Sequence, residues 1–186
     1  MLASQSPRRQ ELLAQIGVHF ELVTVDVLEV IGPDEPHQAY VRRLAEEKAR
    51  AGAALRPGCA VLGADTIGIC DGRLLEKPRD KADAARMLEL LSGNRHQVLT
   101  AVSICRDHRQ STRLSVTDVT FRRLTATEIQ RYWGTGEPRD KAGSYAIQGF
   151  GAVFVESLSG SYSGVVGLPL AETQALLSEF GIPWWQ

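Results

Sequence analysis

The run AVLGADTIGIC at residues 60–70 constrains the fold more than any other part of the sequence. Its apolar residues predict a buried strand, and the Asp71–Gly72 pair that follows predicts a hairpin returning through RLLEKP. Asp65 is the one charged residue inside this run. Because an ionised carboxylate is costly to bury alone, Asp65 needs a hydrogen-bonding network, a metal ion or access to a cleft. A purely structural salt bridge would satisfy it equally well.

Length and charge narrow the classes of protein that this chain can represent. Its 186 residues suit one domain, or one core split into two lobes. The 21 basic and 22 acidic residues leave no broad basic field, which argues against a general nucleic-acid binder. Cys59, Cys70 and Cys105 lack metal-ligand spacing and are expected to be reduced thiols. MLASQSPRRQ has no signal-like apolar region and no run suits a membrane span, so a soluble, cytoplasmic protein is expected.

The order of elements predicts an α/β (mixed α+β) fold with a mixed twisted sheet and flanking helices. Capping residues, apolar spacing and glycine stops indicate helices over 6–17, 36–53, 81–93, 126–136 and 168–180. Alternating or apolar runs indicate strands over 1–4, 19–27, 60–70, 73–78, 96–105, 112–121, 144–149 and 151–160. No GxGxxG follows a strand, so a doubly wound dinucleotide-binding fold is not supported.

Several cations stand at the ends of these elements. Arg8 and Arg9 fall in the first turn of a helix, where the dipole disfavours cations and a bound phosphate would resolve the conflict. Lys48 shares a helical face with Tyr40, Val41, Leu44 and Ala45, and Lys77 follows a strand. Solvated arginines, a snorkelling Lys48 and a surface Lys77 are the alternatives. With Asp65, these cations have the chemistry of a phosphoanhydride site.

Other familiar sites are poorly supported. The glycine-rich segments QGFGAVF and SGSYSGVVGLP lack the lysine and serine spacing of a P-loop. The chain has neither the G-x-S-x-G elbow of many serine hydrolases nor the H-E-x-x-H spacing of a zinc enzyme.

Seven blocks in order, from LASQSPRRQELL to GSYSGVVGLPL, resemble the Maf family of nucleoside triphosphate pyrophosphatases. The other blocks are YVRRLAEEKA, VLGADTIG, LEKPRD, LSGNRHQVLTAV and GEPRDKAGSYAIQGFGAVFVE. The resemblance implies an inosine-triphosphatase-like fold, a single domain over 1–186 with two lobes around a nucleotide-binding cleft. It also implies a nucleotide substrate, and a homodimer as a candidate assembly.

The resemblance also implies roles for individual residues. Asp65 matches the proton acceptor that activates water and shares a divalent metal, Mg²⁺ or Mn²⁺. Glu29 matches an acidic position on the metal side, although Leu28 stands where a second carboxylate is common. Phosphate-binding positions match Arg9, Lys48, Lys77 and Ser4.

Base preference within the family follows three further positions. Arg8, Thr66 and Gln148 match the branch that prefers dTTP and UTP over 7-methyl-GTP. A Gln amide offers both a donor and an acceptor to a pyrimidine edge. The expected reaction is hydrolysis of dTTP or UTP to the monophosphate and pyrophosphate. The alternatives are a broader house-cleaning hydrolase of modified nucleotides and a non-catalytic nucleotide-binding regulator of cell division.

Overall fold

The computed structural model describes residues 1–185. Its α-helices are α1 (Pro7–Gln15), α2 (His37–Leu55), α3 (Lys81–Leu91), α4 (Ala126–Gly134), α5 (Tyr162–Val166) and α6 (Leu170–Glu179). Its strands are β1 (Val61–Cys70), β2 (Arg73–Leu75), β3 (Arg95–Arg106), β4 (Arg109–Phe121) and β5 (Val155–Ser159). Short 3-10 helices are η1 (Glu137–Asp140), η2 (Ala142–Ser144) and η3 (Phe150–Phe154).

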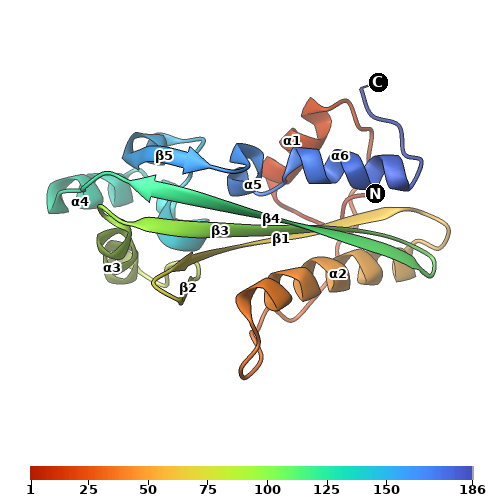
Figure 1. Cartoon of the computed structure of the whole chain (residues 1–186), viewed down its shortest axis with the longest axis horizontal. Coiled ribbons are helices and arrows are strands. Elements are labelled where there is room, and N and C mark those ends of the chain that lie inside the picture. Colours follow the sequence, from red (N-terminus) through yellow and green to blue (C-terminus); the bar gives the residue numbers. More distant parts are fainter. Residues whose placement is uncertain (186) are drawn as a thin grey trace. The chain divides into compact units, whose positions relative to one another are not determined.

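The strands form one five-stranded sheet in the order β2-β1-β3-β4-β5, which Figure 1 shows with its helices. β1 pairs antiparallel with β2, and β4 pairs antiparallel with β5. Leu2 adds parallel bridges to Leu22 and Leu62. Asp71 and Gly72 both have positive φ, as the predicted tight hairpin between β1 and β2 requires. The predicted mixed α/β fold is therefore confirmed.

Two compact units make up the chain. Unit 1 comprises Met1–Thr66, Thr100–Ser115 and Ser163–Gln186, and unit 2 comprises Ile67–Leu99 and Val116–Tyr162. The division falls inside β1, β3 and β4.

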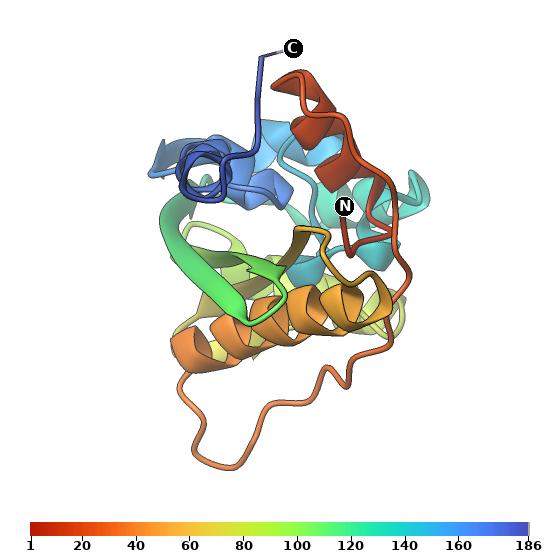
Figure 2. The same ribbon diagram turned by 90° about the vertical axis from the view of Figure 1, so that its right-hand side faces the viewer.

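In unit 1 the strands lie between α2 on one face and α1 and α6 on the other (Figures 1 and 2). Successive side chains of β1 point to opposite faces, because a strand has a period of two residues. Val61 accordingly packs in a cluster with Ala49 and Ala53 of α2. The cluster on the opposite face contains Leu2, Leu12, Leu13, Val18, Leu62, Ala64, Val102, Ile104, Leu168, Leu176, Leu177 and Phe180.

Unit 2 has a core of aromatic rings. Phe121 contacts His96 and Tyr145 edge-on, with ring centroids 5.0 and 4.7 Å apart. Tyr132 of α4 contacts Phe154 of η3 in the same way. α4 begins at the predicted capping box of Thr125 and Glu128, and Asp80 caps α3 as predicted.

Five predicted strands are wrong in part or whole. Residues 1–4 make only the isolated bridges of Leu2, and the strand predicted over 73–78 ends at Leu75. Residues 19–27 make only the bridge at Leu22, because the short segment before α1 offers them little more than Leu2 as a partner. Residues 144–149 form no strand, since Ser144 has positive φ and Gly149 N closes a turn onto Ala146 O. The strand predicted over 151–160 begins only at Val155, because η3 takes up residues 150–154.

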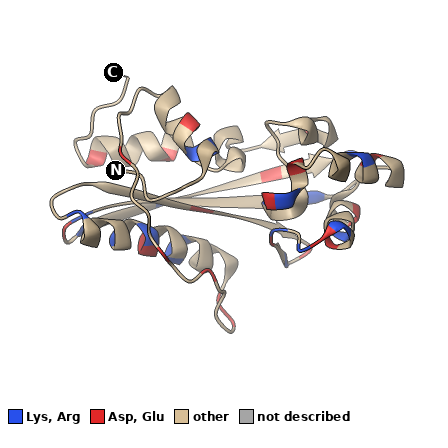
Figure 3. Ribbon diagram, turned by 180° about the vertical axis from the view of Figure 1, so that it is seen from behind, with Lys and Arg blue, Asp and Glu red and all other residues tan. Residues whose placement is uncertain are grey.

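Helix α2, the longest helix of the described residues, carries Arg and Lys alongside Glu, coloured blue and red in Figure 3. None of the helices within residues 1–185 combines the length and the apolarity needed to span a membrane.

Candidate active site

Asp65 and Lys48 form a buried ion pair in unit 1. Lys48 Nζ lies 2.7 Å from Asp65 Oδ1 and 2.6 Å from Glu29 Oε1. Asp65 is 7 % exposed and Lys48 is 9 % exposed, whereas the Glu29 side chain is about half exposed. One ammonium group therefore joins two carboxylates, one buried and one open to solvent. Lys48 does not snorkel, because its charged end is paired inside the unit.

The approach of α2 to β1 explains how Lys48 reaches Asp65. Residues 61, 63 and 65 face α2 by strand alternation. Residue 63 is glycine, and a Cβ there would lie 2.5 Å from Ala45 O and from Ala49 N. The absence of a side chain at Gly63 lets the helix lie directly on the strand. Lys48, one residue before Ala49, then meets Asp65.

Thr66 points to the opposite face of β1, where it meets Arg9 of α1. Arg9 Nη2 donates to Thr66 Oγ1 at 3.2 Å, and Arg9 Nε donates to Gly167 O at 2.8 Å. Arg9 Nη1 donates to Ser4 Oγ at 3.4 Å, and Ser4 Oγ also accepts from Ser6 N. Three acceptors thus fix the plane of the guanidinium. The other Nη hydrogens are suited to a ligand's oxygens, because a guanidinium has five N–H groups.

Burial lowers the pKa of Arg9 below its ordinary value, and the negative charges of Asp65 and Glu29 act against this shift. Arg8, half-buried beside it in α1, adds to the lowering. Arg9 stays charged at neutral pH, because an arginine pKa is far above 7. Two clustered cations at the start of α1, with Lys48 nearby in the same unit, favour a multivalent anion such as a phosphate chain.

The structure places the predicted site residues in two groups. Ser4, Arg8, Arg9, Glu29, Lys48, Asp65 and Thr66 all belong to unit 1, and contacts or electrostatic interactions link them. Lys77 and Gln148 belong to unit 2, where both are exposed. Lys77 follows β2, and Gln148 lies in the turn between η2 and η3. An exposed Lys77 fits both the phosphate-binding prediction and the surface alternative.

The donor set bears on the metal prediction. Across the described residues 1–185, no group of three or more His, Cys, Asp or Glu side chains is arranged to hold a metal ion. Asp65 and Glu29 supply two carboxylates next to one ammonium. Mg²⁺ is commonly bound through one or two carboxylates together with substrate phosphates and water. The residues therefore fit a metal that arrives with a nucleotide.

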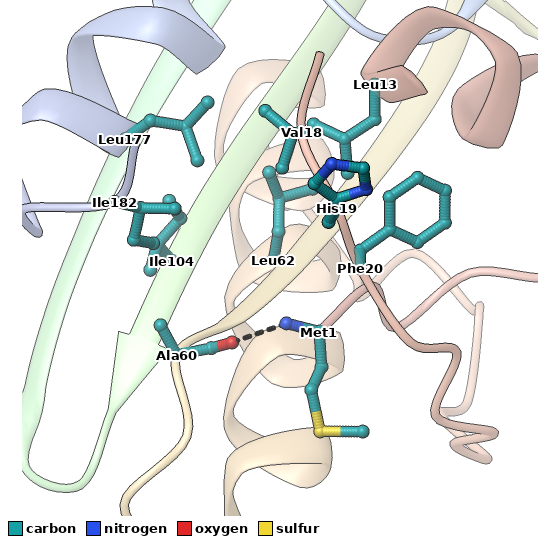
Figure 4. Close-up of a pocket in the computed structure, with 10 residues that line it drawn as sticks. All are labelled: Met1, Leu13, Val18, His19, Phe20, Ala60, Leu62, Ile104, Leu177 and Ile182. Atoms are coloured by element: carbon teal, nitrogen blue, oxygen red, sulfur yellow. Dashed lines mark hydrogen bonds between the residues drawn. The ribbon is translucent and has the colours of Figure 1, made fainter. Parts of the chain in front are cut away.

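A small pocket elsewhere in unit 1 has a different character (Figure 4). Its lining includes the apolar side chains of Leu13, Val18, Leu62, Ile104 and Leu177. At its edge the Met1 amino group donates a hydrogen bond to Ala60 O. None of the predicted site residues lines this pocket. It belongs to the hydrophobic core between β1 and α6.

Two parts of the site were missed at the sequence level. Thr100 of β3 is 1 % exposed and its hydroxyl lies 3.0 Å from that of Thr66. Gly167, with φ of +135°, presents its carbonyl to Arg9. A polar residue inside the apolar run VLTAV would have been the signal for Thr100. No local pattern marks the Gly167 carbonyl, since that contact joins residues 158 positions apart.

Comparison with known proteins gives a consistent result. The family model described as Maf-like protein matches residues 1–180. A dTTP/UTP pyrophosphatase of Saccharophagus degradans is 56 % identical over 189 residues, covering 100 % of this chain and 90 % of the relative. A Vibrio parahaemolyticus protein of the same name is 55 % identical over 181 residues, covering 97 % and 96 %. One from Alkalilimnicola ehrlichii is 54 % identical over 189 residues, covering 98 % and 93 %. The chain therefore belongs to the Maf family.

Proposed function

We infer that this protein is a pyrophosphatase that hydrolyses dTTP and UTP to the nucleoside monophosphate and pyrophosphate. The observation that carries this inference is the Lys48 ammonium held between Asp65 and Glu29, in the same unit as an anchored Arg9. The proteins that share 54–56 % of its residues over nearly its whole length are named dTTP/UTP pyrophosphatases.

Asp65 is proposed to accept the proton of the attacking water. An ionised carboxylate can only accept hydrogen bonds. The ion pair with Lys48 fixes the orientation of the Asp65 carboxylate. The water attacks the phosphate chain and the α–β phosphoanhydride bond breaks, so that pyrophosphate leaves. Positioning and charge stabilisation supply most of the catalysis in phosphoryl transfer.

The cations are proposed to bind the phosphate chain. Arg9 presents a planar guanidinium suited to paired phosphate oxygens, and Lys48 contributes a point charge beside Asp65. Ser4 supports Arg9 through its hydroxyl. Lys77 is proposed as a further phosphate ligand on the strength of the family resemblance.

A divalent cation, Mg²⁺ or Mn²⁺, is proposed as the cofactor. Asp65 and Glu29 would hold it, with phosphate oxygens and water completing its coordination. When bound, the ion neutralises charge that develops on the phosphate oxygens.

Base preference is proposed to depend on Arg8, Thr66 and Gln148. Gln148 is exposed and its amide offers one acceptor and two donor hydrogens to a pyrimidine. Thr66 acts through its bond with Arg9. A cytoplasmic location, a homodimer, independence from nucleic acids and two lobes around a nucleotide cleft stay predictions.

The test is release of pyrophosphate from dTTP, UTP, CTP, 7-methyl-GTP and ITP, with Mg²⁺ or Mn²⁺. We expect release from dTTP and UTP that falls about 10²–10⁴-fold in Asp65→Asn, the range for loss of a general base. Thermal unfolding of the variant is the control for folding, because Glu29 still pairs with Lys48.

Each other result points elsewhere. Equal turnover of all five nucleotides would favour the house-cleaning hydrolase of modified nucleotides. Absence of turnover with either metal would leave the nucleotide-binding regulator. Full activity in Asp65→Asn would remove Asp65 from the reaction.

A further inference from the structure

Thr100 of β3 has a buried hydroxyl that connects the candidate active site to α5. Its Oγ1 lies 2.7 Å from Gly164 O and 3.0 Å from Thr66 Oγ1. The side chain is 1 % exposed, so water does not compete for these bonds. All of these residues belong to unit 1.

The direction of each hydrogen bond follows from the number of hydrogens. A threonine hydroxyl donates one hydrogen and has acceptor sites for two. The Gly164 carbonyl only accepts, so Thr100 gives its hydrogen to Gly164. The Thr66 hydroxyl is then left to donate to Thr100. Thr66 accepts from Arg9 Nη2, which can only donate.

This series of hydrogen bonds determines which part of the Thr66 hydroxyl faces Arg9. With its hydrogen directed at Thr100, the Thr66 hydroxyl keeps a lone pair toward the guanidinium. Without Thr100, that hydrogen loses this acceptor and the hydroxyl can rotate. Arg9 would then be held by Gly167 O at 2.8 Å and by the longer bond to Ser4 Oγ at 3.4 Å.

We propose that Thr100 is a positioning residue for phosphate binding, which orients Thr66 and, through it, the guanidinium of Arg9. Thr100 does not itself touch the nucleotide. The proposal rests on the proposed pyrophosphatase activity and adds to it a residue outside the predicted site.

Thr100→Val tests the proposal, because valine has nearly the volume of threonine and no hydroxyl. We expect the KM for dTTP to rise about tenfold, with a smaller change in kcat, since about 1.4 kcal/mol of binding corresponds to that factor. The dissociation constant for inorganic pyrophosphate, measured by calorimetry, should rise similarly. Thr100→Ser should restore both values to within about threefold of the wild type.

Thr173→Val provides the matched control. Thr173 is also a fully buried threonine of unit 1, but its hydroxyl has no hydrogen-bond partner within the described residues. Its variant should leave KM and pyrophosphate binding unchanged. If Thr173→Val raised KM as much as Thr100→Val, loss of any buried hydroxyl would explain the effect and the proposal would be wrong.

A double variant tests whether Thr100 acts through Thr66. We expect the double variant Thr66→Val/Thr100→Val to have the same KM as Thr66→Val alone. The reason is that Thr66→Val by itself already removes the hydrogen bonds that link Thr100 to Arg9. Multiplied losses would contradict the proposal. Thr100→Cys serves if Thr100→Val does not fold, since it keeps a small side chain with only a weak donor.

The outcome for the wild type separates this proposal from the proposed function. A wild type that does not hydrolyse dTTP would overturn the function. A wild type that hydrolyses dTTP, beside an unchanged Thr100→Val, would overturn only the role of Thr100.

Discussion

Glu137 holds the turn that carries Gln148. Its carboxylate accepts hydrogen bonds from Phe150 N, Gly151 N and the Tyr132 hydroxyl, at 2.9, 3.0 and 2.6 Å. Burial would raise the pKa of Glu137, but these bonds together lower it below its ordinary value. The turn is therefore fixed by an ionised side chain rather than by a neighbouring strand.

Tyr132→Phe should loosen this turn. The Tyr132 hydroxyl donates to Glu137 and accepts from Ala146 N, so the variant leaves a buried amide without its acceptor. Because Gln148 is proposed to recognise the base, a cost of about 1–2 kcal/mol predicts a roughly five- to thirtyfold loss of discrimination between dTTP and CTP, with kcat nearly unchanged. The measurement is kcat/KM for both nucleotides.

Tyr145→Phe is the control for Tyr132→Phe, because the buried hydroxyl that it removes bonds to His96 of β3 and not to Glu137 or Ala146. Equal effects of the two variants would show that Tyr132 does not position Gln148.

Single residues of the site could be predicted from the sequence, but their partners could not. Asp65 stands out as a charge in an apolar run, and Lys48 as a cation on an apolar helical face. Neither pattern says that they pair, since 17 residues separate them. Thr100 was missed because a single hydroxyl in a strand is weak evidence of function without its contacts.

At the scale of elements, Gly63 controls the distance between β1 and α2. Gly63→Ala would place a methyl carbon 2.5 Å from two backbone atoms of α2, which cannot rotate away. We expect a loss of unfolding free energy of about 1–3 kcal/mol, the usual cost of overpacking. Activity should fall as well, because the helix that carries Lys48 must move from Asp65. Urea denaturation and pyrophosphate release measure the two effects.

Gly134→Ala is the matched control for Gly63→Ala. Gly134 is the last residue of α4, and nothing lies within 4 Å of a Cβ placed there. Its variant should be as stable as the wild type or slightly more stable, since alanine favours helix by up to about 1 kcal/mol over glycine. A Gly63→Ala protein as stable as Gly134→Ala would contradict the close packing of α2 on β1.

Helices and turns that are marked by neighbouring residues could be predicted from the sequence. Segments whose structure depends on contacts with distant residues could not. The capping box at Thr125 and the Asp71–Gly72 turn have short-range chemistry, and both are confirmed. Residues 144–149 alternate like a strand, but their backbone groups bond to Tyr132 and within the turn itself. Which partner a backbone amide takes depends on residues distant in the sequence.

For the whole molecule, buried His96 predicts a pH dependence of stability. Burial lowers the pKa of His96 to about 4, whereas the unfolded chain has a value near 6.5. Between these values the unfolded state binds a proton that the folded state does not. The unfolding free energy should therefore fall as the pH decreases from about 6.5 to about 4, by at most about 3 kcal/mol.

His96→Gln isolates this effect, because glutamine stays neutral and can still bond to Tyr145. Urea denaturation at pH 7, 6, 5 and 4 should show a smaller fall for the variant than for the wild type. Parallel curves for the two proteins would mean that His96 is not the group responsible.

The discontinuous make-up of unit 1 was beyond the reach of the sequence. Its residues come from three separate stretches, and apolar spacing shows which residues are buried but not which buried faces meet. Two lobes were predicted from the family resemblance. The division of β1, β3 and β4 between two units emerges only from the folded chain.

Because unit 1 is built from separate stretches of the sequence, its contacts form in a fixed order during translation. Arg9 leaves the ribosome early, but its acceptor Gly167 and the core residues Leu168 and Leu176 are made some 160 residues later. A nascent chain that already contains Asp65 and Lys48 cannot yet hold the guanidinium in place. An incomplete chain released from the ribosome would thus carry Asp65 while Arg9, the proposed phosphate ligand, still lacks its acceptor at Gly167.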